Sequence, residues 1–435
     1  MSQIHATLNN FVMSPIFKDV FSSFPHEYIF DHKGILRRKK RPNCPSCQCK
    51  MSKNGSNKYG KRKFGNIKVG KWVCPNCGNT LEEDRSFWEE MKDDVFEVFS
   101  HMGLLLRKNH VSYEGGSEIL SMIYPMGKET FRMMFKSTIN AVKVSKPKDF
   151  FIVHYDEQHP KKNRIQKYRL TLLDGKTRNI IADELFDDKS SKTIKKFLQK
   201  HLDPKKPVFI VTDFDKRYPG IFDKFFKKGC FHQKCLLHLN KLIVKDFKKE
   251  KSFESLKLQY EFLNIFFDRS KEICSLNGIL KKERSKKNKP GYKDWKKRRR
   301  KQFFNYVHKL ENRYRRRKEK LKLRSYEGAS RMFLKLRKRF DSLPLFAQKR
   351  LLMIQKNWEY LTMFYGFDGT PATNNPIENY YSTSLKTNRK RQYRSDEGIK
   401  EHMKLSQLSR AGQLKYKGRS LFYLIQRFLP FRDYG

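Results

Sequence analysis

The sequence predicts an α/β protein whose mixed central sheet follows the order βββαβ, with a long all-helical insertion and a cysteine-containing region in front. Three observations support this fold class. Residues 150–215 have the patterns of strands with one helix among them, residues 236–363 are helical in pattern, and two Cys-x-x-Cys pairs lie within 44–77. A chain of 435 residues with 38% hydrophobic residues is long enough for two or three domains with buried cores.

The charge of the chain is strongly unbalanced. Lysine and arginine number 96 against 45 acidic residues, which gives a formal net charge of +51. So many like charges oppose folding of the chain alone and predict a polyanionic partner. Nucleic acid fits this role best, because neutralising phosphates releases condensed counterions, and a ribosome-bound or RNA-coating protein stays open as an alternative.

Membrane and secretion signals are missing from the sequence. No stretch reaches the roughly 18 consecutive apolar residues of a membrane span, and the N-terminus has neither a basic segment nor a long apolar one. We therefore expect no membrane partner and a soluble protein, cytoplasmic and nucleoid-associated in a prokaryote or nuclear in a eukaryote.

Two Cys-Pro-x-Cys motifs predict a zinc ribbon over residues 42–80, because this spacing wraps backbone around a tetrahedral thiolate site. The expected ligands are Cys44, Cys47, Cys74 and Cys77. Four thiolates leave no open position for water, so the Zn²⁺ would be structural. Cys49 lies close enough to replace Cys47 as a ligand. Residues 1–41 end in a basic run and are expected to form an N-terminal arm or linker.

Residues 84–145 have the pattern of three short helices. The apolar periodicity covers residues 86–106, 113–124 and 128–142, with polar, Gly or Pro breaks between them. The last two helices resemble a helix-turn-helix, a DNA-binding motif in which the second helix reads the major groove. Its exposed face would carry Lys128, Thr130, Arg132 and Lys136. A helical linker packed on the core is the alternative interpretation.

Residues 148–239 form the first part of the predicted core, with Asp156 in its first strand and Asp213 at the end of its fourth. The expected strands cover residues 150–158, 168–176 and 178–186, a fourth strand lies in the run 207–215 and ends before Asp215, and the helix covers 190–201. In a βββαβ fold the first and fourth strands lie side by side, so the two carboxylates would be neighbours.

Glu378, on a predicted helix at 375–389, is the third candidate carboxylate. Clustered carboxylates repel one another unless cations fill the cluster, and hard oxygen ligands favour Mg²⁺ or Mn²⁺. Two acidic neighbours compete with these residues. Strand alternation turns Glu157 to the opposite face of the sheet, and Asp215 falls beyond the strand end.

The order of these motifs resembles the DDE transposases of the Mutator-like group and their prokaryotic insertion-sequence relatives. The resemblance covers roughly residues 44–400. It is carried by Asp156, Asp213 and Glu378, by the C-x-x-H motif of Cys235 and His238, by the long helical insertion, and by Thr373, Asn374 and Asn375 of a T-N-N-x-x-E pattern.

The resemblance implies an RNase H-like catalytic core that uses two metal ions to cleave transposon ends and join them to target DNA. It also implies that Lys386, Arg389 and Arg391 face the DNA backbone from the helix of Glu378. Double-stranded DNA, at the transposon ends and the target, would be the partner. Because two ends must meet before cutting, we expect a homodimer or larger assembly on DNA.

The C-x-x-H motif has two interpretations. Cys235 and His238 lie on one helical face and could hold part of a zinc ion, with Cys230 or His232 completing it. We favour the alternative that they pack or hydrogen-bond near the active site as support. His154 shares a strand face with Asp156 and is a further neighbour, although a buried, satisfied histidine is the commoner case.

The helical insertion over residues 240–372 contains a strongly basic block. Half of the 44 residues between Lys281 and Arg324 are Lys or Arg, and four are acidic. Aromatic residues lie among these charges, namely Trp295, Phe303, Phe304, Tyr306 and Tyr314. Cations with aromatics suit gripping DNA or stacking on an exposed base, and a solvated helix face is the alternative for most of the charges.

Residues 373–435 are expected to contain the last part of the core and a basic C-terminal tail with an apolar stripe at 421–429. Two other functions stay open beside a DNA transposase. A nuclease or junction resolvase would share the fold and metals but never join DNA, and a catalytically inactive transposase derivative would bind DNA alone. The complete carboxylate triad weakens the second of these.

Overall fold

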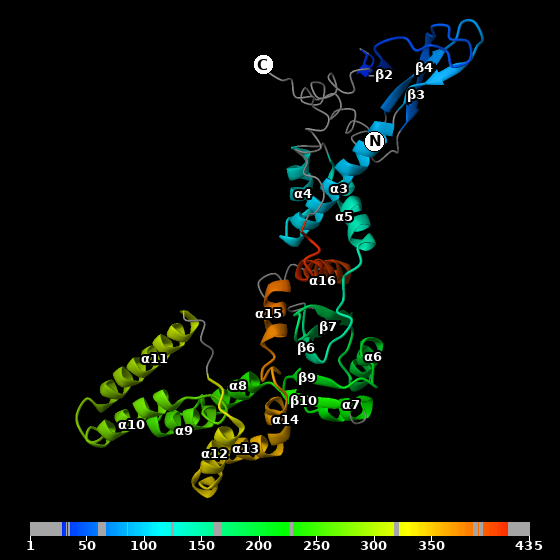
Figure 1. Cartoon of the computed structure of the whole chain (residues 1–435). Helices are drawn as coiled ribbons and strands as arrows, with labels where there is room; N and C mark the ends of the chain where they lie inside the picture. The colour runs from blue at the N-terminus through cyan, green and yellow to red at the C-terminus, as the bar shows by residue number, and fades with distance from the viewer. Residues whose placement is uncertain are drawn as a thin grey trace. The chain divides into compact units, whose positions relative to one another are not determined.

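A computed structural model describes residues 28–415 except 32, 34, 60–66, 85, 123–125, 161–166, 227–228, 317–321, 386–389 and 391–394. The chain divides into two compact units (Figure 1). The first unit contains residues 1–145 and 395–435, and the second contains residues 146–394. In the described part of the chain, no helix is both long and apolar enough to cross a lipid bilayer.

The first unit contains a five-stranded sheet with the order β1-β2-β4-β3, in which β5 pairs with β4. Its strands are β1 (Tyr28–Phe30), β2 (Ile35–Arg38), β3 (Ser52–Tyr59), β4 (Ile67–Val73) and β5 (Thr80–Glu82). The sheet therefore begins before residue 42, where the sequence predicted the end of an arm. Ile35 and Leu36 are buried, and β2 pairs in parallel with β4, so the apolar start of the basic run completes the sheet.

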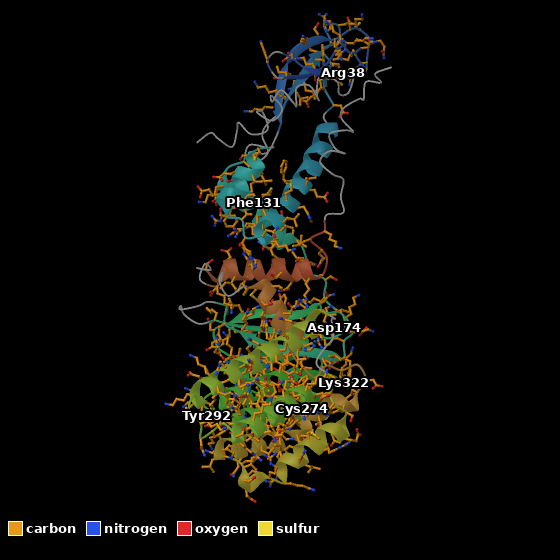
Figure 2. All side chains as sticks on the ribbon, turned by 90° about the vertical axis from the view of Figure 1, so that its left-hand side faces the viewer. Arg38, Phe131, Asp174, Cys274, Tyr292 and Lys322 are labelled. Atoms are coloured by element: carbon orange, nitrogen blue, oxygen red, sulfur yellow. The ribbon has the colours of Figure 1, made fainter. Side chains whose placement is uncertain are left out.

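Four helices make up the rest of the described first unit: α3 (Ser86–Lys108), α4 (Tyr113–Ser121), α5 (Lys128–Ala141) and α16 (Asp396–Arg410). The first three match the predicted helices to within a few residues. Phe131 of α5 is fully buried (Figure 2), in space left by the missing side chain of Gly116. Ser112 caps α4 by accepting a hydrogen bond from the backbone N–H of Gly115.

Helix α16 belongs to the first unit, although the sequence analysis grouped residues 373–435 with the core. Its Leu405 and Leu408 pack in one buried cluster with Leu104 of α3 and Phe135 of α5. This apolar stripe explains the placement, because it needs the matching faces of α3 and α5 to leave water. The stripe predicted at 421–429 lies outside the described residues.

The second unit contains a mixed five-stranded sheet with the order β10-β9-β6-β7-β8. Its elements in chain order are β6 (Ile152–Gln158), β7 (Tyr168–Asp174), β8 (Ile180–Phe186), α6 (Ser191–His201), β9 (Val208–Thr212), α7 (Tyr218–Phe226) and β10 (Cys230–Lys234). Strands β6, β7 and β8 pair antiparallel, whereas β9 pairs in parallel with β6 and β10. The predicted βββαβ order is confirmed, and β10 extends it.

The two faces of this sheet have different covers (Figure 1). Helices α6 and α7 pack on the face that carries Val153 and Tyr155. On the other face, α15 (Asn375–Ser384) buries Ile377 and Tyr380 against β7 and β8. Because side chains alternate along a strand, Asp156 lies on the α15 face.

The predicted helical region between the sheet and α15 is confirmed, and its helices share one apolar core. They are α8 (Leu236–Phe247), α9 (Phe253–Leu263), α10 (Ser270–Arg284), α11 (Tyr292–Arg316), α12 (Tyr326–Arg337), α13 (Leu345–Lys356) and α14 (Trp358–Thr362), with short 3₁₀ turns at Phe340–Ser342 and Met363–Gly366.

Candidate functional site

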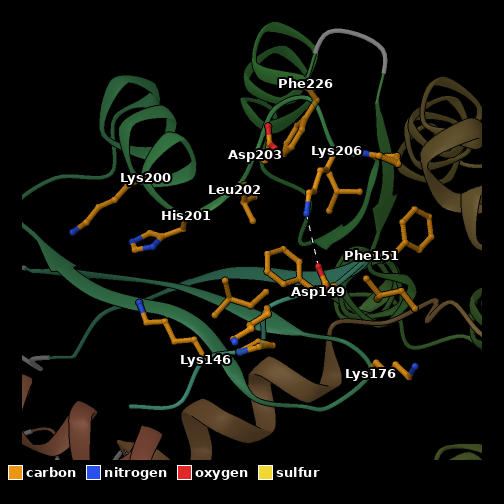
Figure 3. A pocket seen from close by; sticks show the side chains of 17 residues that line it. Lys146, Asp149, Phe151, Lys176, Lys200, His201, Leu202, Asp203, Lys206 and Phe226 are labelled. Atoms are coloured by element: carbon orange, nitrogen blue, oxygen red, sulfur yellow. Dashed lines mark ion pairs between the residues drawn. The ribbon is translucent and has the colours of Figure 1, made fainter. Parts of the chain in front are cut away.

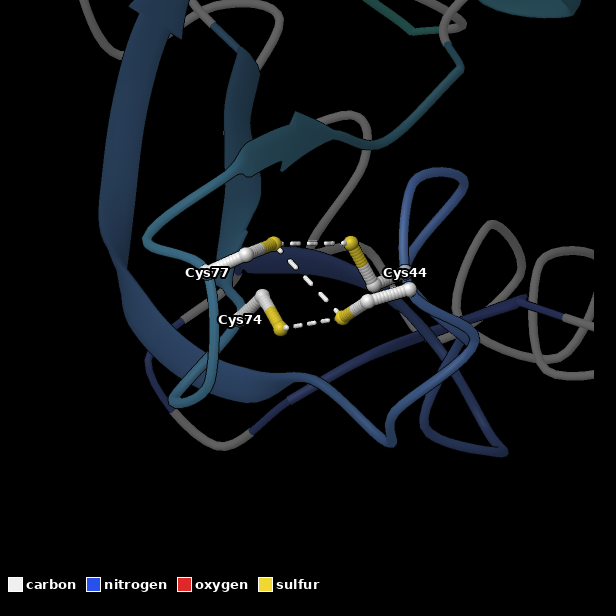
Figure 4. Close-up of side chains that lie close together, drawn as sticks. Cys44, Cys74 and Cys77 are labelled. Carbon is white, nitrogen blue, oxygen red and sulfur yellow. Dashed lines mark hydrogen bonds between the residues drawn. The ribbon is translucent and has the colours of Figure 1, made fainter.

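The four cysteines of the two Cys-Pro-x-Cys motifs meet at one point of the first unit (Figure 4). The sulfur of Cys44 lies 3.5 Å from that of Cys77, and the sulfur of Cys47 lies 3.3 Å from that of Cys74. All four sulfurs fall within 4.8 Å of one another. A tetrahedral Zn²⁺ with bonds of about 2.3 Å would hold its sulfurs about 3.8 Å apart, so the cluster fits zinc.

The backbone turn in each Cys-Pro-x-Cys motif explains this convergence. The backbone N–H of Gln48 donates to the carbonyl oxygen of Cys44, and the N–H of Gly78 donates to that of Cys74 in the equivalent turn. Gln48 and Gly78 both adopt positive φ, at 60° and 71°. The backbone N–H of Cys49 and the thiol of Cys74 lower the pKa of Cys47 to about 6. Cys47, rather than Cys49, belongs to the cluster.

The predicted DNA-reading residues of α5 are partly engaged within the chain. Lys128 lies 3.8 Å from Glu114, Arg132 lies 2.7 Å from Glu129, and Thr130 is half-buried. Lys136 pairs at 2.8 Å with Glu397 of α16, so its ammonium is directed toward a neighbouring helix. Such exposed pairs are weak, about 0–1 kcal/mol, and a phosphate could replace the carboxylates.

Asp156 and Asp213 lie at neighbouring positions on adjacent parallel strands. The register between β6 and β9 pairs His154 with Val211, and continuing it by two residues brings Asp156 beside Asp213. Burial, followed by the negative charge of Asp213, raises the pKa of Asp156 to about 8, and Glu378 adds to this effect. The sequence prediction that β6 and β9 bring these two positions together agrees with the register.

Asn374 fixes the start of α15 against this part of the sheet. The side chain is fully buried and bonds two consecutive residues of β6. Its Oδ1 lies 2.9 Å from Nδ1 of His154, and its Nδ2 donates to the carbonyl oxygen of Tyr155 at 3.0 Å. Its backbone N–H donates to Sγ of Cys235 at 3.1 Å. One residue thus joins β6, the start of α8 and the start of α15, which carries Glu378.

A second set of contacts holds the remainder of α15. The guanidinium of Arg169 on β7 forms a fully buried, two-pronged ion pair with Asp183 on β8. The hydroxyl of Tyr380 donates to the same carboxylate at 2.6 Å, and that of Tyr381 donates to the carbonyl oxygen of Asp156 at 2.7 Å. These hydrogen bonds fix the side of α15 that faces the sheet.

Glu378 lies in the first turn of α15 and contacts α8. Its Oε1 is 3.0 Å from Nζ of Lys241 and 3.4 Å from Nε2 of His238. The carboxylate is one-third exposed, whereas the Lys241 side chain is 61% exposed. Lys241 was not predicted from the sequence, although its spacing of three residues from His238 puts both on the same face of α8.

The carboxylates of Asp156, Asp213 and Glu378 are less tightly gathered than the cysteines. Within the described residues, the four-cysteine group is the one set of three or more Cys, His, Asp or Glu side chains that lies closely enough to hold a metal ion. The Lys241 ammonium is Glu378's closest cationic partner among these residues.

The competing acidic residues have other partners. Glu157 accepts a hydrogen bond from the hydroxyl of Tyr218 at the start of α7, and it pairs at 3.0 Å with Lys189, which precedes α6. Asp215 forms a two-pronged pair with Arg217, whose hydrogen bonds lower the pKa of this carboxylate. Both arrangements agree with the sequence argument that separated these residues from Asp156 and Asp213.

The cysteine and histidines of the C-x-x-H region contact the start of α15 or the neighbouring strand β9. Cys235 is buried at the start of α8 and receives the Asn374 N–H, and His238 faces Glu378. His232 is buried and bonds Thr212 at 2.8 Å, and burial lowers its pKa to about 3. Burial likewise lowers the pKa of His154 to about 4. In the described part of the chain, no metal-binding group includes any of these four residues.

A separate cavity of about 840 Å³ opens at the other end of the same strands (Figure 3). It is lined by residues that begin β6 and β9, including Phe151 and Val208, and by Lys146 and Lys206. Asp156 and Asp213 lie toward the opposite ends of these strands. The cavity is therefore distinct from the carboxylates.

The residues predicted to contact DNA after Glu378 and those in the basic block differ in how far the structure describes them. Lys386, Arg389 and Arg391 lie outside the described residues, as does the side chain of Tyr314. Among the aromatics of the basic block, Phe303 is buried and Trp295 packs near Phe253. Phe304 and Tyr306 are exposed.

Comparisons with known proteins give one finding on relatedness. No model of a known protein family matches the chain. Over 233 residues the chain is 23% identical to the uncharacterized 48.3 kDa protein of insertion element ISM1 from Methanobrevibacter smithii. The aligned region covers 50% of this chain and 56% of that relative. The chain is thus distantly similar to an insertion-element protein.

Proposed function

We propose that the protein is a DNA transposase of the DDE type, which cleaves transposon ends and joins them to target DNA. The observation that carries the proposal is the register of β6 and β9, which brings Asp156 beside Asp213 at one end of the sheet. Burial and the negative charges of Asp213 and Glu378 raise the pKa of Asp156 there. The similarity to an insertion-element protein supports the same function.

The sheet supports an RNase H-like core. Three antiparallel strands, a helix and a parallel strand follow one another along the chain, and the strand order is β10-β9-β6-β7-β8. The helices between α8 and α14 then form an insertion between β10 and α15. The five-stranded sheet of the first unit, with its four-cysteine cluster, and the helix pair α4–α5 would recognise the element's ends.

The carboxylates fit a divalent cation. Asp156 lies beside Asp213, and within the described residues neither carboxylate forms an ion pair with Lys or Arg. Hard oxygen ligands of this kind suit Mg²⁺ or Mn²⁺, with Asp156, Asp213 and Glu378 as the protein's ligands. When bound, such ions would activate the attacking water or 3′-hydroxyl and stabilise the leaving oxygen.

The chain's own residues prepare this site in distinct ways. Asp156 must lose its proton, which the pKa of about 8 makes costly at neutral pH without a cation. Asn374 holds α15 against β6, so it sets the position of Glu378. Lys241 pairs with Oε1 of Glu378 and would compete with a cation for this carboxylate.

The experiment that tests the proposal uses labelled duplex carrying the terminal sequence of the chain's own element, with Mg²⁺ or Mn²⁺. Wild type is compared with Asp213→Asn, and with Asp223→Asn as an acidic control on α7. We expect cleavage at the element boundary and joined products, both absent in Asp213→Asn and retained in the control. Cleavage without joining would indicate a nuclease, and binding without cleavage by wild type would indicate a DNA-binding protein.

Transposition also requires two ends to be held together, so we propose a homodimer or larger assembly on DNA. Mass photometry with end DNA would measure the number of protomers in each complex. A single protomer on a pair of ends would contradict this assembly.

A further inference from the structure

Helix α11, in the basic part of the helical region, has one face fixed by packing. Phe303, Val307 and Leu310 are buried at a spacing of four and three residues, as on one side of a helix. The Phe303 ring lies 5.4 Å from that of Tyr260 on α9. Tyr292 (Figure 2) lies at the start of the helix. Its ring stacks near that of Trp295. The rotation of α11 about its axis is therefore set.

The flank beside this buried face combines cations with an exposed aromatic ring. Lys297, Lys301, Phe304 and His308 follow at intervals of four, three and four residues, so they form one stripe along the helix. All four are exposed, and Phe304 keeps 44% of its surface accessible. The guanidinium of Arg300 lies 5.5 Å from the Phe304 ring.

The positive charge of this stripe is not compensated locally. Among the described residues, neither Lys297 nor Lys301 has a carboxylate within 4.0 Å. Of the nearby acidic residues, Glu283 accepts a hydrogen bond from the Tyr292 hydroxyl instead. An uncompensated row of cations attracts an external anion, and an exposed phenyl ring within that row gains from a flat apolar partner.

We propose that the stripe formed by Lys297, Lys301 and Phe304 binds an unpaired stretch of nucleic acid. The lysines and Arg300 contact phosphates, and Phe304 stacks on an exposed base. A duplex offers the phosphates but hides the faces of its bases, so the aromatic ring favours a single strand over a duplex. The inference rests on the proposed function in taking DNA as the partner.

The test measures fluorescence anisotropy of labelled single-stranded DNA and of the matching duplex with the full-length chain, in buffer without divalent cations. We expect Phe304→Ala to weaken single-strand binding about 5- to 150-fold, which corresponds to about 1–3 kcal/mol for one stacked base. Phe304→Trp should retain binding. Tyr326→Ala, which changes an aromatic residue of similar exposure (45%) on α12, is the matched control.

The lysines give a second, independent signature. For single-stranded DNA each phosphate contact contributes about 0.7 to the slope of log affinity against log salt. Lys297→Ala with Lys301→Ala should therefore reduce that slope by about 1.4. Phe304→Ala should leave the slope unchanged, because stacking releases no counterion.

Three results would overturn the proposal. In the first, Phe304→Ala weakens binding to single strand and duplex equally. In the second, it weakens binding to neither. In the third, the protein binds phosphatidylserine vesicles through Phe304 and shows no preference between single strand and duplex. The last would assign the stripe to an anionic membrane surface. Because no divalent cation is present, these readings do not depend on cleavage. A chain that fails to cut DNA but loses single-strand binding with Phe304→Ala would refute the transposase alone.

Discussion

Replacing Asn374 with alanine should separate α15 from the sheet and weaken the carboxylate site. The side chain is fully buried and makes two hydrogen bonds to β6, one with the His154 ring and one with the Tyr155 carbonyl oxygen. Alanine removes both partners but is too short to let the neighbours close the gap. Two buried polar groups are then left without partners.

The size of this effect follows from those two groups. A buried donor or acceptor without a partner costs about 1–3 kcal/mol, so the loss is about 2–6 kcal/mol. The other ring nitrogen of His154, Nε2, already lacks a hydrogen-bond partner among the described residues, so the ring has no alternative acceptor at hand. We expect the free energy of opening of β6 to fall by this amount.

The measurement is hydrogen–deuterium exchange of peptides from β6 and β9, read by mass spectrometry over a urea series. Asn375→Ala is the matched control, because Asn375 is exposed and adjacent. It should change the opening free energy by less than about 0.5 kcal/mol. An Asn374→Ala variant that destabilises β6 no more than Asn375→Ala does would show that these two hydrogen bonds do not hold α15 on the sheet.

Three further predictions concern charge and metal. The folded-state pKa of Asp156, about 8, exceeds its unfolded value near 4, so the metal-free fold should lose stability between pH 4 and 8; Asp156→Asn should flatten this dependence in thermal melts. Lys241→Met should tighten Mn²⁺ binding about 1.4- to 5-fold in calorimetry, since it removes an exposed ion pair; Lys245→Met, one turn further along α8, should not. Cys74→Ser should abolish zinc binding and exchange protection of β4 while the sheet of the second unit keeps its protection. The first prediction is contradicted if stability depends on pH equally in wild type and Asp156→Asn. The second is contradicted if Lys241→Met leaves the Mn²⁺ affinity unchanged, and the third if Cys74→Ser still binds zinc.

Local patterns were enough to predict most of the elements around the carboxylates but not their partners. The strands β6 to β9 could be predicted because each is a run of apolar and β-branched residues bounded by turn residues. In contrast, β2 was hidden by the basic run that begins with Arg37 and Arg38. Arg37 is nonetheless buried, since its guanidinium reaches Asp31, six residues before it, and the carbonyl oxygen of Gly55, which lies on another strand and is revealed by no local pattern.

The carboxylate positions were predictable for the same reason, and their surroundings were not. Strand alternation separated Asp156 from Glu157, and the structure gives Glu157 a lysine partner on the other face. The role of Asn374 depends on three segments meeting, so the sequence marks it only as part of a motif. The contact of Lys241 with Glu378 depends on the approach of α8 to α15. The placement of α16 in the first unit depends on its packing against α3.

The central claim is that Asp156, Asp213 and Glu378 meet at one divalent-cation site. Iron-dependent cleavage of the polypeptide tests it most directly: Fe²⁺ replaces Mg²⁺, and ascorbate with peroxide generates radicals that cut the backbone near the bound ion. The account predicts cuts near residues 156, 213 and 378, suppressed by excess Mg²⁺ and absent in Asp213→Asn. Cuts confined to residues 44–77, or cuts unchanged in Asp213→Asn, would contradict it.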